Sequence, residues 1–100
     1  MELPTKVSVL LIGVLQDLAG RARISLEFDG DLVRDAIWEL AELLSPKFRH
    51  SLIDPELDDP RPNLLVLLNG KEISVLNGLE TRVKNGDELA LVPVAHGGRS

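Results

Sequence analysis

The last twelve residues, from Leu89 to Ser100, constrain this chain more than any other stretch. Leu89–Val92 is a short apolar run that follows the turn residues Asn85-Gly86-Asp87, a pattern typical of a buried strand. Pro93 has no N–H to give to a neighbouring strand, so the strand is expected to end there.

Two adjacent glycines, Gly97 and Gly98, stand two residues before the end. Glycine loses much backbone entropy on ordering and buries no side chain, so this pair adds little to a fold. A narrow enzyme channel that must contact backbone gains from residues without a Cβ. We therefore expect residues 1–95 to form one domain and residues 96–100 to project from it as a flexible tail.

The composition is that of one ordinary globular domain. The chain has 100 residues, of which 44% are hydrophobic and 27% charged. No run approaches the ~18 to 20 apolar residues of a membrane-spanning helix, and the N-terminus has no charged-then-apolar signal layout. We expect a cytoplasmic protein with no membrane partner.

The charge and the cysteine count exclude several function classes. There is no cysteine, which rules out disulfides, thiolate metal sites and a cysteine nucleophile in this chain. The net charge of −5 argues against nucleic acid as a partner, because phosphate contacts need clustered Lys and Arg. The charge suits docking on a more basic enzyme surface.

The N-terminal third reads as two strands joined through a short helix. Lys6–Gly13 is apolar on both faces after its polar start and predicts an internal strand. Val14–Ala19 predicts a short helix that stops at Gly20. Ala22–Phe28 alternates apolar and polar residues, which predicts a half-exposed strand paired with the first.

One long helix is expected next, with Asp31 as its N-cap. Apolar residues within 32–44 form one helical stripe and predict the buried face: Val33, Ile37, Leu40, Ala41 and Leu44. Ser45-Pro46 ends the helix, because the residue before a proline disfavours the helical conformation. Trp38 lies off the stripe, and packing at the flank of the core is favoured over contact with a partner.

The C-terminal half reads as a long loop followed by three strands. Lys47–Pro62 contains three prolines and predicts a loop with, at most, a short helical turn. Asn63–Leu68 predicts a buried strand, closed by the type I′ turn signal Asn69-Gly70. Glu72–Leu76 predicts a short edge strand and Asp87–Val92 the last strand. The order β-β-α-β-β-β predicts an α+β fold, a mixed sheet with one long helix across one face.

Several motifs, taken in order, carry a family resemblance. They are Leu18-Ala19-Gly20, Asn69-Gly70-Lys71-Glu72, Leu76-Asn77-Gly78-Leu79-Glu80-Thr81, Asn85-Gly86-Asp87-Glu88 and Val92-Pro93-Val94-Ala95-His96-Gly97-Gly98. This pattern resembles the ubiquitin-like β-grasp superfamily. Within it, the chain is most similar to the group of the molybdopterin-synthase small subunit, the thiamine sulfur carrier and the ubiquitin-related modifiers, which includes small archaeal-type modifiers. The resemblance covers nearly the whole chain, although residues 45–62 are longer than the usual connection.

No residue set predicts intrinsic catalysis. His50 and His96 stand alone, without the spacing of a metal site, and no phosphate-binding glycine motif occurs. The carboxylate pairs Asp58-Asp59 and Asp87-Glu88 are neighbours in sequence, and the second pair is typical of a turn. We expect no catalytic residue, no bound cofactor and no metal.

The resemblance implies that the reactive group is the C-terminal carboxylate. In the family, a separate adenylating enzyme uses ATP and Mg²⁺ to convert the terminal glycine to an acyl-adenylate. A sulfur donor then gives a thiocarboxylate, or an enzyme cysteine gives a thioester that passes to a target lysine. By resemblance, Gly98 is the activated residue, Gly97 lets the tail thread, and the partner grips Val94, Ala95 and His96.

Arg99 and Ser100 depart from the pattern, which ends at the diglycine. Three alternatives stay open. The two residues are a precursor extension that a protease removes between Gly98 and Arg99, or they are a remnant of cloning. In the third alternative the diglycine has no function. Under the first alternative, the resemblance implies a zinc metalloprotease of the deubiquitinase type, with the metal in the protease. Processing favours a modifier, whereas the body of the sequence leans toward the carriers.

A docking surface is expected beside the tail, on the sheet face opposite the helix. The candidates for outward positions are drawn from Val66, Leu68, Ile73, Leu89 and Leu91, although a core position is favoured for each of them singly. Strands that are apolar on both faces leave open which alternate set faces outward.

Three functions stay open. The first is a modifier conjugated to lysines of target proteins, with Lys6, Lys47, Lys71 and Lys84 as possible acceptors within the chain itself. The second is a carrier that bears a thiocarboxylate for molybdopterin synthesis or tRNA thiolation and delivers sulfur to an acceptor enzyme. The third is an interaction domain with no use for its tail.

Overall fold

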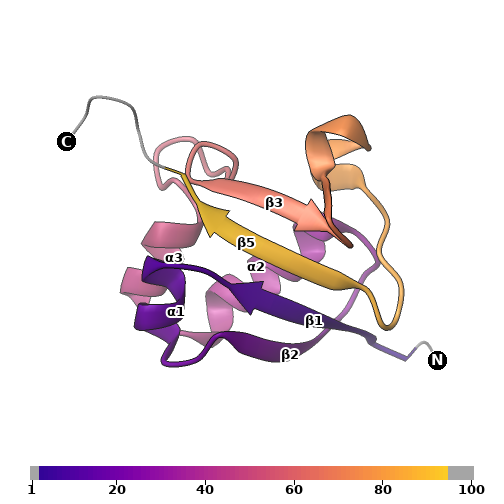
Figure 1. The fold of residues 1–100 in the computed structure, drawn as a ribbon, viewed down its shortest axis with the longest axis horizontal. Helices are drawn as coiled ribbons and strands as arrows, with labels where there is room; N and C mark the ends of the chain where they lie inside the picture. The colour runs from indigo at the N-terminus through magenta and orange to yellow at the C-terminus, as the bar shows by residue number, and fades with distance from the viewer. Residues whose placement is uncertain (1–2, 95–100) are drawn as a thin grey trace.

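The structure is a computed structural model that describes residues 3–94 (Figure 1). The predicted tail at 96–100 lies outside the described residues. The main elements are β1 (Thr5–Leu11), α1 (Val14–Ala19), β2 (Arg23–Phe28), α2 (Val33–Leu43), α3 (Pro46–Leu52), β3 (Leu64–Leu68), β4 (Lys71–Glu72) and β5 (Glu88–Pro93). Two short 3-10 helices, η1 (Ile73–Val75) and η2 (Gly78–Glu80), connect β4 to β5.

The five strands form one mixed sheet in the order β2-β1-β5-β3-β4. β1 pairs antiparallel with β2 and parallel with β5, while β3 pairs antiparallel with β5 and with β4. The last strand therefore lies at the centre of the sheet, between the first strand and the third. The helices all lie on one side of the sheet (Figure 1), so the predicted α+β architecture is confirmed.

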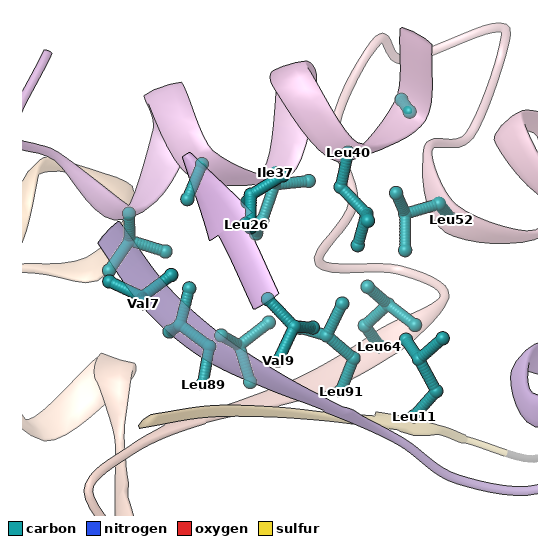
Figure 2. Packing of buried hydrophobic residues seen from close by; sticks show 14 of the residues in the cluster. Val7, Val9, Leu11, Leu26, Ile37, Leu40, Leu52, Leu64, Leu89 and Leu91 are labelled. Carbon is teal, nitrogen blue, oxygen red and sulfur yellow. The ribbon is translucent and has the colours of Figure 1, made fainter. Parts of the chain in front are cut away.

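The core lies between α2 and one face of the sheet (Figure 2). Alternate residues of the long strands point to this face, because strand side chains alternate in direction. Buried strand residues include Val7, Val9, Leu11, Ile24, Leu26, Phe28, Leu64, Val66, Leu68, Leu89 and Leu91. From the helix, Val33, Ile37, Leu40 and Ala41 are buried as the stripe predicts. Leu44 and Trp38 pack against the core while partly exposed, so Trp38 has the predicted flank position.

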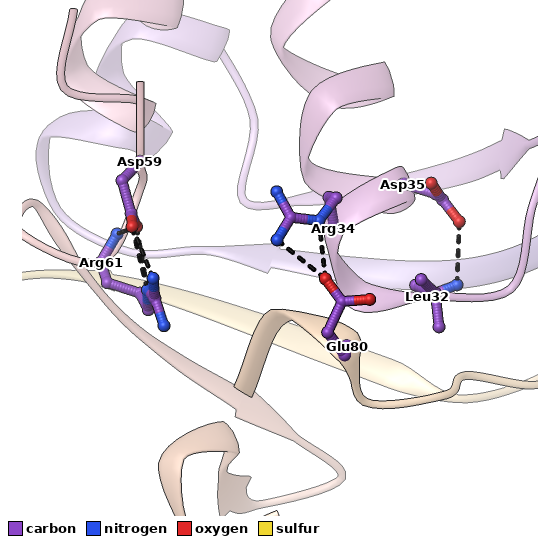
Figure 3. Close-up of polar contacts among 6 residues, drawn as sticks. All are labelled: Leu32, Arg34, Asp35, Asp59, Arg61 and Glu80. Atoms are coloured by element: carbon purple, nitrogen blue, oxygen red, sulfur yellow. Dashed lines mark hydrogen bonds and ion pairs between the residues drawn. The ribbon is translucent and has the colours of Figure 1, made fainter. Parts of the chain in front are cut away.

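The predicted N-cap of the long helix is wrong. The cap position is Leu32, and the capping carboxylate is Asp35, whose Oδ2 accepts the N–H of Leu32 at 3.1 Å and that of Asp31 at 3.2 Å (Figure 3). The Asp31 side chain instead pairs with Arg82. An acid in the first turn of a helix can accept unpaired N–H groups at its start, as an N-cap side chain does.

The first hairpin agrees with the sequence analysis. α1 spans Val14–Ala19 as predicted, and Gly20 ends it with a positive φ of 81°. Ile24, Leu26 and Phe28 face the core from β2. The helix inserted between the two strands therefore leaves their antiparallel pairing intact.

Two predictions for the C-terminal half need correction. The predicted loop at 47–62 begins with a full helix, α3, because Ser45 caps it by accepting the N–H of Phe48 at 3.1 Å and Pro46 occupies its first turn. The predicted edge strand at 72–76 is largely wrong. β4 ends at Glu72 and the chain turns into η1, which buries Ile73. The turn itself is as predicted, since Asn69 and Gly70 both have a positive φ.

The loop from α3 to β3 is closed by carboxylates. Asp54 Oδ1 accepts the N–H groups of Glu56 and Leu57 at 2.9 and 3.0 Å. Asp59 is paired with Arg61, whose Nη2 donates to Asp59 Oδ2 at 2.6 Å (Figure 3). Hydrogen bonds from the Arg61 guanidinium lower the pKa of the Asp59 carboxyl. The loop is thus fixed locally before β3 begins.

Replacing Leu40 by alanine is expected to reduce the free energy of unfolding by roughly 2 to 5 kcal/mol, because it opens a cavity under α2. Leu40 is 1% exposed, whereas Leu43 on the same helix is 55% exposed. Leu43→Ala is therefore the matched control and should change stability little. Urea denaturation measures both. Equal losses for the two variants would contradict the assignment of the buried face.

The Asp59–Arg61 pair predicts a pH-dependent term in stability. Because the pKa of Asp59 is lowered by folding, its stabilisation is complete above the unfolded pKa of about 3.9 and is lost as pH falls through the folded pKa. Asp59→Asn should cost up to about 1 kcal/mol at neutral pH, with the difference shrinking below about pH 4. Denaturation series of both proteins at several pH values measure this. Asp58→Asn is the control, and a pH-independent difference for Asp59→Asn would refute the prediction.

Candidate functional site

The candidate site begins where the chain leaves the sheet. The Ile12 N–H donates to the Leu91 carbonyl at 3.2 Å, and this is the end of the β1–β5 pairing. In a parallel pair of strands the next hydrogen bond would come from the backbone N–H of residue 93 to β1, and a proline has no N–H. On the other side, the Val94 N–H still donates to the Asn63 carbonyl at 3.0 Å. Val94 thus continues the line of β5 and is held on its β3 side.

The structure agrees that Pro93 gives no hydrogen bond to β1, but the prediction that the strand ends before Pro93 is wrong. Pro93 belongs to β5 and pairs with Leu64, so the strand runs one residue further than expected. Its ring lies against the turn into α1, within 3.8 Å of where a Cβ on Gly13 would stand. Gly13 has a φ of 61°, a conformation that favours glycine. Proline and glycine together therefore set the point at which the tail departs.

Of the predicted tail residues, Val94 is described, and its side chain is exposed. Ala95, His96, Gly97, Gly98 and Arg99 lie outside the described residues. Their predicted roles in recognition, activation and processing stay predictions. What the structure supplies is the base of the tail.

The candidates for outward residues of the sheet all belong to the core, as the sequence favours for each of them taken singly. Val66, Leu68, Ile73, Leu89 and Leu91 are all buried, the most exposed being Leu68 at 8%. They point to the side covered by the helices. The opposite alternate set forms the open face.

Five half-buried apolar residues gather on this open face beside the tail, and we call them the outer patch: Leu10, Leu65, Leu67, Ala90 and Val92. The strand register makes them neighbours. Ala90 stands between Leu10 on β1 and Leu67 on β3, and Val92 stands opposite Leu65. The central strand that carries Ala90 and Val92 continues directly into the tail. A partner that grips the tail would meet this patch at the same time.

A polar row borders the outer patch on the side away from the tail. Arg23 Nη1 donates to the Ser8 hydroxyl at 2.9 Å and to Glu88 Oε2 at 2.6 Å, linking three adjacent strands. Beyond it, Asn69 Nδ2 donates to Asp87 Oδ1 at 3.0 Å. These residues are exposed (Arg23, Asn69) or half-buried (Ser8, Asp87, Glu88), and their side chains satisfy one another. The open face is thus apolar near the tail and polar farther along the strands.

The other singled-out residues show no convergent chemistry. His50 is exposed on α3 rather than in a loop. Asp87 Oδ2 accepts the Lys84 N–H at 2.8 Å, which confirms its role in the turn. Between residues 3 and 94, no group of three His, Asp or Glu side chains could hold a metal ion. The helices in this same range are too short or too polar to cross a membrane.

The sequence did contain a signal for the outer patch. Each strand begins with polar residues on the open face: Lys6 and Ser8 in β1, Asn63 before β3, and Glu88 in β5. Counting by twos from them reaches the outer patch, because strand side chains alternate. The apolar residues alone do not indicate which alternate set faces outward.

The chain matches known proteins over most of its length. Residues 9–98 match the model of the ThiS family. A protein of Archaeoglobus fulgidus, named as a candidate sulfur carrier, is 40% identical over 37 residues, which are 37% of this chain and 42% of that protein. The alignment thus spans less than half the length of that relative.

Solved structures agree over nearly the whole chain. The solution structure of small archaeal modifier protein 1 from Methanosarcina acetivorans has a TM-score of 0.82 at 27% identity, covering 95% of this chain and 98% of that one. CysO, from the BexX/CysO complex of Amycolatopsis orientalis, has a TM-score of 0.69 at 26% identity, covering 92% and 99%. Both the predicted β-grasp fold and the predicted family resemblance are therefore confirmed. This chain is a member of the ThiS family, with the ubiquitin-like fold that its sulfur carriers and protein modifiers share.

Proposed function

We propose that this protein is a ubiquitin-like modifier that is conjugated to lysines of target proteins through Gly98. The observation that carries the proposal is the path of the chain out of the sheet. β5 is a central strand, and at its end Pro93 has no N–H to donate to β1. The exposed Val94 follows, and the sequence then continues to the diglycine. The likeness to small archaeal modifier protein 1 over 95% of the chain supports it. A metalloprotease of the deubiquitinase type would first remove Arg99 and Ser100.

The chemistry takes place on the tail and is driven by a partner. The Gly98 carboxylate attacks the α-phosphate of ATP, pyrophosphate leaves, and an acyl-adenylate forms. ATP and Mg²⁺ belong to the activating enzyme. Attack by an enzyme cysteine expels AMP and gives a thioester, and a target lysine then takes the acyl group to form an isopeptide bond. This chain contributes the carboxylate, its presentation and its docking surface, and it catalyses no step itself.

The outer patch is suited to dock the activating enzyme. It is apolar, it borders the tail, and its central residues Ala90 and Val92 belong to the strand that becomes the tail. Docking there fixes the base of the tail relative to the enzyme. The glycines then need to order over a short span only, which limits the entropy lost on binding. The charged residues of the polar row would set the orientation of the partner.

The alternative function is sulfur transfer, with Gly98 carried as a thiocarboxylate. The family match and the Archaeoglobus fulgidus relative favour it. The acyl-adenylate is common to both functions, and only the nucleophile differs. A sulfur donor in place of a cysteine gives the carrier.

Intact mass spectrometry of the untagged protein from its own cells tests maturation. We expect a chain that ends at Gly98. While Gly98 is in a peptide bond to Arg99 it has no free carboxylate, so no acyl-adenylate can form on it. Adducts on lysines of other proteins would support the modifier. A mass raised by the difference between sulfur and oxygen would support the carrier. Retention of Arg99 and Ser100 on every molecule would refute both.

Substitution of Leu67 tests the docking surface. In cells, Leu67→Glu should lower the amount of Gly98 conjugates roughly tenfold or more, the effect of losing about 1.4 kcal/mol of binding. Leu43→Glu is the matched control, because Leu43 is 55% exposed and lies on α2, which packs on the opposite face of the sheet. Circular dichroism should show both variants folded. Full conjugation by Leu67→Glu would show that the enzyme docks elsewhere.

A further inference from the structure

Three Asn-Gly dipeptides stand in the last third of the chain: Asn69-Gly70, Asn77-Gly78 and Asn85-Gly86. An asparagine that precedes a glycine can lose its side-chain amide by ring closure, because glycine has no Cβ to shield its backbone nitrogen or to restrict the rotation that ring closure needs. All three asparagines are exposed, so access to water does not distinguish them. Their hydrogen bonds distinguish them.

The side chain of Asn69 is held at both of its polar atoms. Its Nδ2 donates to Asp87 Oδ1 at 3.0 Å, and its Oδ1 accepts the Glu88 N–H at 2.9 Å. Ring closure requires this side chain to turn toward the Gly70 nitrogen. Both hydrogen bonds, which link the turn after β3 to the start of β5, would have to break first.

Asn85 is protected at the side chain and at the attacking nitrogen. Its Oδ1 accepts the Lys6 N–H at 2.9 Å. The N–H of the next residue, Gly86, donates to the Lys6 carbonyl at 3.0 Å, so the nitrogen that would attack is already engaged. Reaction here would separate the turn before β5 from β1.

Asn77 lies between η1 and η2 and has neither protection. No hydrogen bond holds its side chain among residues 3–94, and the Gly78 N–H has no backbone acceptor in the same range. Ring closure turns the peptide group between these two residues. The bond that this breaks runs from the Glu80 N–H to the Asn77 carbonyl at 3.1 Å, within a 3-10 turn, whose hydrogen-bond geometry is poorer than that of an α-helix.

We propose that Asn77 is a site of non-enzymatic deamidation in the folded protein, where it is converted to aspartate and isoaspartate while Asn69 and Asn85 stay intact. The proposal does not depend on the proposed conjugation through Gly98. Either product adds one negative charge to the net charge of −5. Isoaspartate also adds one carbon to the main chain just before η2, whose buried Leu79 faces the core beside α2.

The reaction consumes water and needs no oxidant or reductant. Hydroxide takes the Gly78 N–H proton, and the nitrogen attacks Asn77 Cγ. A new C–N bond forms, the bond from Cγ to Nδ2 breaks, and the leaving nitrogen takes up a proton and departs as ammonia. Water then opens the cyclic imide. Opening at Cγ gives aspartate, and opening at the main-chain carbonyl carbon gives isoaspartate.

Incubation of the full chain at mildly alkaline pH, followed by peptide mapping with mass spectrometry, tests the proposal. Asn77 should deamidate roughly fivefold or more faster than Asn69 or Asn85, because each hydrogen bond that must break is worth about 1 kcal/mol, which is about fivefold in rate. In concentrated urea the three rates should converge, because each asparagine precedes a glycine and no fold protects it. Equal rates in the folded protein, or the same preference for Asn77 in urea, would overturn the proposal.

Two variants supply the controls, and circular dichroism should show both folded. Asn77→Gln should remove most of the product, because the longer side chain must close a larger ring. Asp87→Ala removes the acceptor of Asn69 Nδ2 and should speed deamidation at Asn69, with Asn77 as the internal reference. An unchanged ratio of the two rates in folded Asp87→Ala would contradict protection by hydrogen bonds.

Discussion

The parallel pairing of β1 with β5 is the interaction on which the rest of the structure depends. It joins the hairpin of β1 and β2 to the strands β3 and β4, which bond to β5 from its other side. It also completes the apolar surface on which α2 packs, since Val9 and Leu91 come from these two strands (Figure 2). This pairing stops after Leu91, two residues before β5 itself ends at Pro93.

The fold was largely predictable because its signals are local and agree with one another. The helical stripe from Val33 to Ala41, the glycine stop at Gly20 and the Asn69-Gly70 turn each specify one conformation, and the structure contains all three. α3 was missed because a single buried pair, Phe48 and Leu52, is too short a pattern to separate a helix from a loop. The edge strand after Glu72 was over-extended because Ile73 reads equally well as a strand residue or a buried 3-10 residue.

The candidate site divides into a part that sequence specifies and a part that it leaves open. The diglycine and Pro93 are visible in the sequence, and the structure explains how the proline frees one side of the tail. The sequence left open which set of strand residues faces outward, because Leu89, Ala90, Leu91 and Val92 are all apolar. A one-residue change of parity exchanges the core for the surface, and the packing of α2 against one set decides the matter. The contacts of Lys6 were not predictable, since it meets Glu27 only through the strand register and Asn85 only through a hydrogen bond made in the folded chain.

The position of β5 in the sheet has a consequence for synthesis of the chain. The strand made last is the one that links the two halves of the sheet in the part of the chain that the structure describes. A chain that ends before Glu88 lacks β5, the strand that bonds to both β1 and β3. The apolar inner faces of its remaining strands stay open to water or to proteases. Joining of the two halves into one sheet therefore waits for β5, the last strand that the structure describes. Chains that lack β5 are therefore expected to be unstable even when all the other strands are present.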